Sequence, residues 1–179
     1  MQTKAPKYPF FEKFVREHMP TVTGKSQVFD AYVKWSQLGT NPAFMSLLWS
    51  TDPIVMVSDF PCETNRETGR SRLSAGMTWS KTKLGLAEAV VSRYDTAAMR
   101  AGASRNDRKT QLRFAEWRGY LEATLVHEMV HWGRKVRGVS AKTDEEEEKA
   151  AADFERAAYG EVVVAPEKLC FEIETYNAK

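Results

Sequence analysis

Apolar residues recur at intervals of three and four positions along several stretches of the chain, a spacing that predicts helices. Residues 9–20 predict a short amphipathic helix, and residues 26–39 predict a second one capped by Ser26. The longest such pattern runs from Asp107 to Arg134. Its recurring apolar positions are Leu112, Ala115, Leu121, Leu125, Val126, Met129 and Val130. This stretch therefore predicts a long helix with one continuous apolar face.

Strand signals are fewer and shorter. Residues 52–59 predict a short buried strand bounded by turn-forming residues. Residues 61–76 are polar and predict a long exposed loop. Residues 89–94 favour a strand, with a helix ending near Asp95 as the alternative. Together these segments predict a single α+β domain over residues 1–179, mostly helical with a small sheet.

The charge pattern narrows the class of protein. Charged residues make up 28% of the chain, hydrophobic residues 42%, and the formal net charge is +2. A balance so close to neutral argues against a nucleic-acid partner or insertion into an anionic membrane. The N-terminus has no apolar run of the kind that Sec signals carry, and no segment reaches transmembrane length. Cys62 and Cys170 are expected to be reduced thiols, with a disulfide in an oxidising compartment as the alternative.

Two of the three histidines lie in the long helical pattern, within the sequence "LVHEMVHW". His127 and His131 are four residues apart, so a helix places their imidazoles on the same face, one turn apart. Glu128 between them completes the pattern His-Glu-x-x-His, in which two histidines bind one zinc ion and the glutamate is the general base. Without a metal, burying these three polar groups would be costly. The sequence therefore predicts a zinc site with Glu128 as the catalytic residue.

The third zinc ligand is expected to be a carboxylate, because no histidine follows His131. Further along the chain, Thr143 and Glu146 form a capping box that begins a new helix. Glu155 lies on the apolar stripe of that helix, where a carboxylate needs a partner, and it is the preferred ligand. Glu148 lies two turns earlier on the same face. It is the alternative, because an antiparallel helical hairpin would place it closer to the level of His131.

The segments "LEATLVHEMVHWG" and "FERAAYG", within residues 121–160, resemble the metallopeptidase toxin family of bacterial polymorphic toxins. Some members of that family are attached to VgrG spike proteins of type VI secretion systems. The resemblance implies a zincin-like fold with an edge strand beside the cleft. It also implies that His127, His131 and Glu155 bind zinc and that Glu128 is the base.

The resemblance further implies a function and partners. We expect a zinc-dependent metallopeptidase that acts as an antibacterial toxin effector, hydrolysing a protein or peptide substrate. It would be delivered without a Sec signal by a VgrG-type carrier, act in the periplasm of target bacteria, and be neutralised by a cognate immunity protein. Two other classes remain open: a SprT-like, DNA-associated metalloprotease and a non-catalytic zinc-binding adaptor or spike-extension domain.

Overall fold

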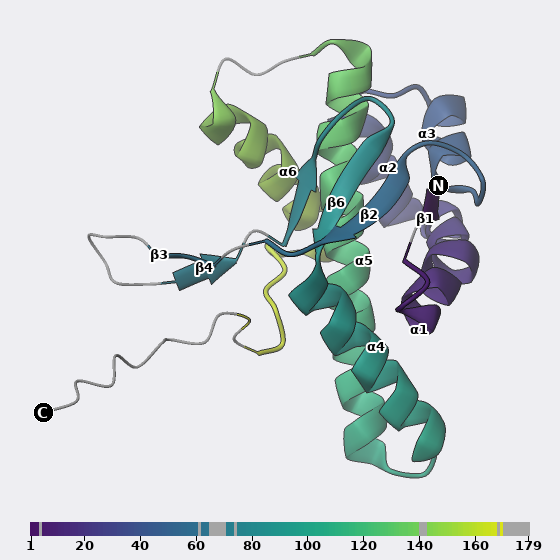
Figure 1. Cartoon of the computed structure of the whole chain (residues 1–179). Coiled ribbons are helices and arrows are strands. Elements are labelled where there is room, and N and C mark those ends of the chain that lie inside the picture. The colour runs from purple at the N-terminus through teal and green to yellow at the C-terminus, as the bar shows by residue number, and fades with distance from the viewer. Residues whose placement is uncertain are drawn as a thin grey trace, which may run out of the picture.

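The computed structural model describes residues 1–3, 5–60, 62–64, 71–73, 75–139, 143–167 and 169. It is mostly helical with a small four-stranded sheet and a separate two-stranded sheet of β3 and β4, so the predicted α+β class is confirmed (Figure 1). The helices are α1 (Pro9–Lys13), the π-helical turn η1 (Phe14–His18), the 3-10 segment η2 (Met19–Gly24), α2 (Ser26–Ser36), α3 (Thr40–Leu47), α4 (Glu88–Ala103), α5 (Arg108–Arg137) and α6 (Asp144–Tyr159). The strands are β1 (Gln2–Thr3), β2 (Ile54–Ser58), β3 (Cys62–Thr64), β4 (Ser71–Leu73), β5 (Gly76–Thr78) and β6 (Lys83–Ala87).

The long helix α5 is the central element of the fold, as the 107–134 pattern predicted. The side chain of Asp107 caps its first turn by accepting a hydrogen bond from the backbone N–H of Lys109 at 3.1 Å. At the other end Gly138 takes a left-handed conformation (φ 70°), which ends the helix. Between these caps α5 packs against α2, α4, α6, β5 and β6, so its middle is covered on several sides (Figure 1).

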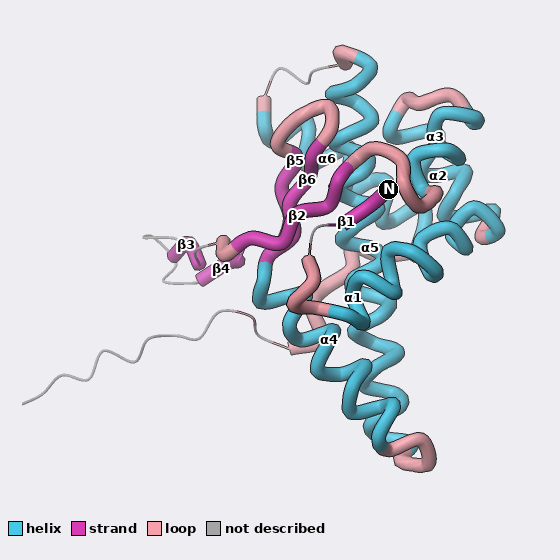
Figure 2. Tube along the Cα trace, turned by 45° about the vertical axis from the view of Figure 1, so that its right-hand side comes forward, coloured by secondary structure: helices cyan, strands magenta, loops and turns pink. Residues whose placement is uncertain are grey.

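The four-stranded sheet has the order β1-β2-β6-β5 and lies along one side of α5 (Figure 2). Strands β1, β2 and β6 are parallel, whereas β5 is antiparallel to β6, with Gly76 opposite Leu86. The buried face of the sheet carries Val55, Leu84 and Leu86, all fully shielded from solvent. Strand β5 is the outer strand of this sheet and also packs against α5. This edge of the sheet therefore lies beside α5.

Several predicted elements differ from the structure. The strand predicted for residues 52–59 is confirmed as β2, but the loop predicted for residues 61–76 is wrong, because it contains β3, β4 and the start of β5. The strand predicted for residues 89–94 is also wrong: the alternative helix is present and extends to Ala103. Its buried positions, Val90, Val91, Tyr94, Ala97, Ala98 and Ala101, follow the helical spacing.

The N-terminal helix is broken into three pieces. The predicted helix over residues 9–20 becomes α1, η1 and η2, with Phe11, Phe14 and Val15 buried. The predicted cap at Ser26 is wrong, because α2 begins there after Lys25 and no side chain caps it. The side chain of Cys62 and all of Cys170 lie outside the described residues. Within the described part of the chain, no helix is both long and apolar enough to span a bilayer.

A buried carboxylate fastens the N-terminal segment to α5. Glu122 is 4% exposed and accepts from Lys25 Nζ at 2.5 Å, while His18 Nε2 lies 2.5 Å from the same oxygen. The hydroxyl of Tyr159, at the end of α6, donates to the other oxygen at 3.4 Å. Burial would raise the pKa of Glu122, but the bonds from His18 and Lys25 outweigh it and hold the pKa below its usual range.

We expect Glu122→Gln to lower the free energy of unfolding by about 1.5–3 kcal/mol at pH 7, the usual worth of hydrogen bonds to a charged group. Because the pKa of Glu122 is lowered on folding, its contribution is full above its ordinary pKa of 4.5 and is lost as the pH falls through the folded-state pKa. Thermal melts of both proteins at pH 7 and pH 3 check this. A difference in melting temperature that stays constant between the two pH values would contradict it.

Candidate metal centre

His127 and His131 lie on successive turns of α5, and the Nε2 atoms of their rings face each other. Their Nε2 atoms are 3.2 Å apart. Glu148, from the first half of α6, adds a carboxylate from the facing helix. One of its oxygens is 3.7 Å from Nε2 of His127 and the other is 3.6 Å from Nε2 of His131. These three residues form the His/His/Glu cluster, whose ligand atoms lie within 4.8 Å of one another.

The spacing of these atoms fits a tetrahedral metal ion. Two ligand atoms bound at about 2.0–2.1 Å with a tetrahedral angle between them are about 3.4 Å apart. The two Nε2 atoms, 3.2 Å apart, are close to that value, and Glu148 places one oxygen 3.7 Å from Nε2 of His127 and the other 3.6 Å from Nε2 of His131. Two imidazole nitrogens and one carboxylate also leave a fourth position open, as catalytic zinc sites do. The donor set therefore fits a zinc ion.

Glu155 takes a different place from the one preferred by the sequence. It is 6% exposed, and its Oε1 lies 2.6 Å from Nδ1 of His127, the nitrogen on the far side of the ring from the cluster. Its Oε2 accepts a hydrogen bond from the backbone N–H of Val163 at 2.8 Å. A buried carboxylate does need partners, but here they are an imidazole and a backbone amide. Glu155 thus contacts Nδ1 of His127, and Glu148 is the carboxylate that the structure brings near the two Nε2 atoms.

His131 also has a carboxylate beside its Nδ1, but at a longer distance. Glu147 Oε1 lies 3.5 Å from Nδ1 of His131 and accepts a hydrogen bond from Nε of Arg134 at 2.9 Å. The sequence did not single out Glu147, because it lies in an acidic run that suits any helix N-terminus. The predicted capping of that helix is confirmed, since Thr143 Oγ1 accepts from the backbone N–H of Glu146 at 3.2 Å. This cap fixes the turn that carries Glu147 and Glu148.

Glu128 lies between the helix and the outer strand β5. It is 6% exposed, and the hydroxyl of Thr78 donates to its backbone carbonyl at 3.0 Å and approaches its carboxylate Oε2 at 3.4 Å. A Cβ placed on Gly76 would be 2.4 Å from Cγ of Glu128, so this position has room only for glycine. Burial raises the pKa of Glu128 to about 7, with neighbouring His127 opposing that shift. A carboxylate with a pKa near neutrality is suited to general-base catalysis.

Comparison with known families decides the relationship that the motifs suggested. The family model described as metallopeptidase toxin 3 matches residues 4–160. The chain belongs to this family. No curated protein and no solved structure gave a significant match. Membership in a metallopeptidase toxin family indicates a toxin with peptidase activity that uses a metal ion, and the His/His/Glu cluster is the group in the described part of the chain that could hold one.

The charges at the centre of this metallopeptidase toxin favour a cation. Burial would lower the pKa of His127, but Glu148 and Glu155 outweigh it and raise the pKa to about 10. Burial lowers the pKa of His131, and the positive charge of His127 lowers it further. The two rings thus share a position where one positive charge is stabilised by surrounding carboxylates. A divalent ion bound at the two Nε2 atoms would be stabilised by the same carboxylates.

We expect Gly76→Val to impair the toxin by displacing Glu128. The first side-chain carbon of the valine would lie 2.4 Å from Cγ of Glu128, so the Glu128 side chain would have to move. Peptidase activity should fall at least tenfold while the protein still binds metal, because Gly76 is not a member of the His/His/Glu cluster. A matched control is Gly119→Val, since a Cβ there meets nothing within 4 Å. Equal activity of Gly76→Val and the wild type would contradict this placement of Glu128.

Proposed function

We propose that the chain is a zinc-dependent metallopeptidase whose ion is held by His127, His131 and Glu148. The observation that supports this most strongly is the 3.2 Å approach of the two Nε2 atoms, with the Glu148 carboxylate 3.6–3.7 Å from both. Glu155 is a positioning residue in this proposal, because a carboxylate at Nδ1 fixes the ring and its tautomer so that Nε2 can bind the metal. Glu147 has the same role at His131.

The chemistry divides between the ion and the chain. A bound zinc ion would act as a Lewis acid, lowering the pKa of a water molecule and polarising the scissile carbonyl. Glu128 takes the proton from the attacking water and passes it to the leaving amine. Burial raises the pKa of this carboxylate, which favours uptake of the proton. Thr78 and Gly76 keep the carboxylate in place beside the histidine turn.

The substrate is a protein or peptide, and we expect it to lie along β5. This strand is the outer strand of the sheet and carries Gly76 and Thr78, both of which contact Glu128. An extended peptide that added to this edge by backbone hydrogen bonds would bring one of its carbonyl groups toward the metal centre. A structural adaptor would have no use for a buried carboxylate base at this place, which favours the enzyme over the adaptor alternative.

Membership in a toxin family supports a wider biological role. We propose an antibacterial effector delivered by a type VI secretion system on a VgrG-type carrier, acting in the periplasm of the target cell and held in check by an immunity protein. The test is to express the chain in bacteria with and without a Sec signal. We expect growth arrest with the signal only. Equal growth arrest from both, or arrest from the cytoplasmic form alone, would contradict the periplasmic assignment.

The peptidase proposal itself is tested on purified protein. We expect about one zinc ion per chain, hydrolysis of an unfolded protein substrate such as casein, loss of that activity with a chelator, and its return when zinc is added back. Peptide-bond hydrolysis that survives complete removal of metal would contradict the proposal. Affinity for DNA that falls steeply with salt would instead favour the SprT-like alternative.

A further inference from the structure

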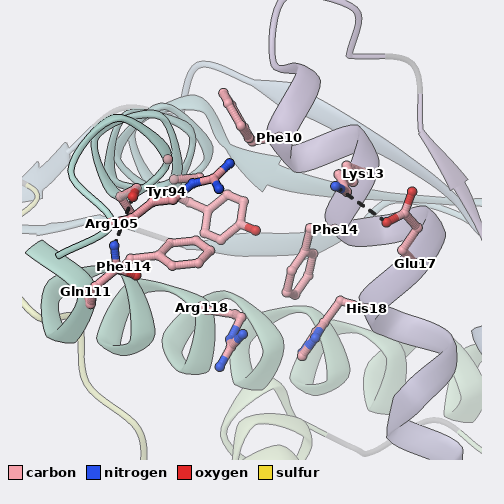
Figure 3. Close-up of a pocket in the computed structure, with 13 residues that line it drawn as sticks. Phe10, Lys13, Phe14, Glu17, His18, Tyr94, Arg105, Gln111, Phe114 and Arg118 are labelled. Carbon is pink, nitrogen blue, oxygen red and sulfur yellow. Dashed lines mark hydrogen bonds and ion pairs between the residues drawn. The ribbon is translucent and has the colours of Figure 1, made fainter.

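A second concave site lies away from the metal centre. It is a pocket of about 400 Å³ between α1 and η1 on one side and α4 and the first half of α5 on the other (Figure 3). No residue of the His/His/Glu cluster lines it, and its last lining residue on α5, Arg118, precedes His127 by about 13 Å of helix. The volume falls within the range of about 300–1,000 Å³ that is usual for small-molecule sites. We call it the aromatic pocket.

The wall of the aromatic pocket is made of flat rings from three elements. The ring of Phe14 lies 5.2 Å from that of Tyr94, and the ring of Tyr94 lies 5.8 Å from that of Phe114. The imidazole of His18 stacks on Phe14 at 4.7 Å and is itself held by Glu122. Ring pairs at these separations interact favourably, and they offer a further planar ring the same kind of contact.

The rim of the aromatic pocket is positively charged. Lys13, Arg105 and Arg118 border it, against one acid, Glu17, whose carboxylate is 3.8 Å from Lys13 Nζ. Within the described part of the chain, neither Arg105 nor Arg118 forms an ion pair with a carboxylate. The guanidinium of Arg118 instead lies 5.7 Å from the centre of the Phe114 ring. The rim thus carries two net positive charges, as many as the whole chain.

The pocket wall also offers a hydrogen-bond donor, the hydroxyl of Tyr94. Tyr94 is 4% exposed, and among the described residues no group forms a hydrogen bond with its hydroxyl. The hydroxyl points toward Phe14 and the interior of the pocket (Figure 3). Burial raises the pKa of Tyr94, against the opposing effect of Arg118, so the group stays protonated and can donate. A ligand with an acceptor at this position could therefore take a hydrogen bond from the Tyr94 hydroxyl.

We propose that the aromatic pocket binds a small molecule that joins a planar aromatic ring to an anionic group. The ring packs among Phe14, Tyr94 and Phe114. The anion lies at Arg105 and Arg118 and accepts the hydrogen bond from the Tyr94 hydroxyl. This site is independent of the proposed peptidase chemistry, because it shares no residue with the metal centre.

The test uses 2-naphthalenesulfonate as the probe, titrated into the full chain by isothermal calorimetry. The neutral analogue 2-naphthalenemethanol has the same ring system without the charge, and we expect it to bind at least tenfold more weakly. The blocking variant is Gly102→Trp: Gly102 lines the pocket, and a Cβ there meets nothing within 4 Å, so a large side chain can start at this position and reduce the space in the pocket. Its matched control is Gly119→Trp, which is equally open but lies outside the pocket.

We expect Gly102→Trp to weaken binding of the sulfonate at least tenfold and Gly119→Trp to leave it unchanged. Two milder variants, Arg118→Met and Tyr94→Phe, should each weaken it several-fold with melting temperatures close to that of the wild type. The proposal is overturned if the sulfonate does not bind at millimolar concentration, or if Gly102→Trp binds it as the wild type does. Equal affinity for the sulfonate and the neutral alcohol would also overturn it, because the anion would then contribute nothing.

Discussion

Replacing Glu128 by alanine or glutamine should abolish peptidase activity and leave the metal in place. Glu128 is not a member of the His/His/Glu cluster, so zinc content should match that of the wild type. General-base catalysis contributes about 10²–10⁴-fold, and we expect kcat to fall by at least that factor. Glu128→Gln is the sharper variant, because it keeps the shape of a side chain packed against Gly76. Casein hydrolysis and metal analysis on the same samples measure both effects.

A control for Glu128 is Glu116→Gln, which removes a carboxylate from the exposed side of the same helix, where it pairs with Arg113 at 3.2 Å. It should keep full activity. Growth arrest by the Sec-directed form should likewise disappear in Glu128→Gln and persist in Glu116→Gln. Full peptidase activity in Glu128→Gln would remove the assigned base and, with it, the proposed mechanism.

Replacing Glu148 should cause loss of the metal, whereas replacing Glu155 should lower the affinity for the metal to a smaller extent. Substituting a carboxylate that orients a ligand histidine lowers metal affinity by about 10–100-fold. Removing a ligand itself should cost more, so we expect Glu148→Ala to bind zinc more weakly than Glu155→Ala. The two variants also differ in stability. Glu155→Ala leaves the backbone N–H of Val163 and Nδ1 of His127 without their partner, at about 1–3 kcal/mol for a buried group.

The Glu148 side chain is 61% exposed, so Glu148→Ala should fold as the wild type does when both are measured in a chelator. Zinc affinity by competition with a chromophoric chelator, together with thermal melts, separates the two roles. Weaker zinc binding in Glu155→Ala than in Glu148→Ala would reverse the assignment and restore the ligand that the sequence favoured.

The sequence predicted best what depends on near neighbours along the chain. The spacing of apolar residues predicted α5, and Thr143 and Glu146 predicted the start of α6. Each of these signals lies within a few residues of the feature it specifies. The four-residue spacing of His127 and His131 belongs to the same class, because one turn of helix suffices to bring the two rings together.

What the sequence could not predict depends on how distant segments meet. Glu148 and Glu155 are nearly two full turns apart and lie on one helix face. Which of the two reaches the metal therefore depends on how far α6 is shifted along α5. The burial of Glu155 was foreseen, but a buried carboxylate can satisfy an imidazole Nδ1 as well as a metal. Strand β5 has only three residues, and its place beside Glu128 follows from pairing with β6 and from the absence of a side chain at Gly76.

The most direct test of the proposed metal centre is a crystal structure of the zinc-loaded protein with anomalous diffraction collected at the zinc absorption edge. We expect one peak between α5 and α6, at about 2.0–2.2 Å from Nε2 of His127, Nε2 of His131 and a carboxylate oxygen of Glu148, with Glu155 at Nδ1 of His127. A peak coordinated by Glu155 in place of Glu148, or no zinc peak at the two histidines, would contradict it.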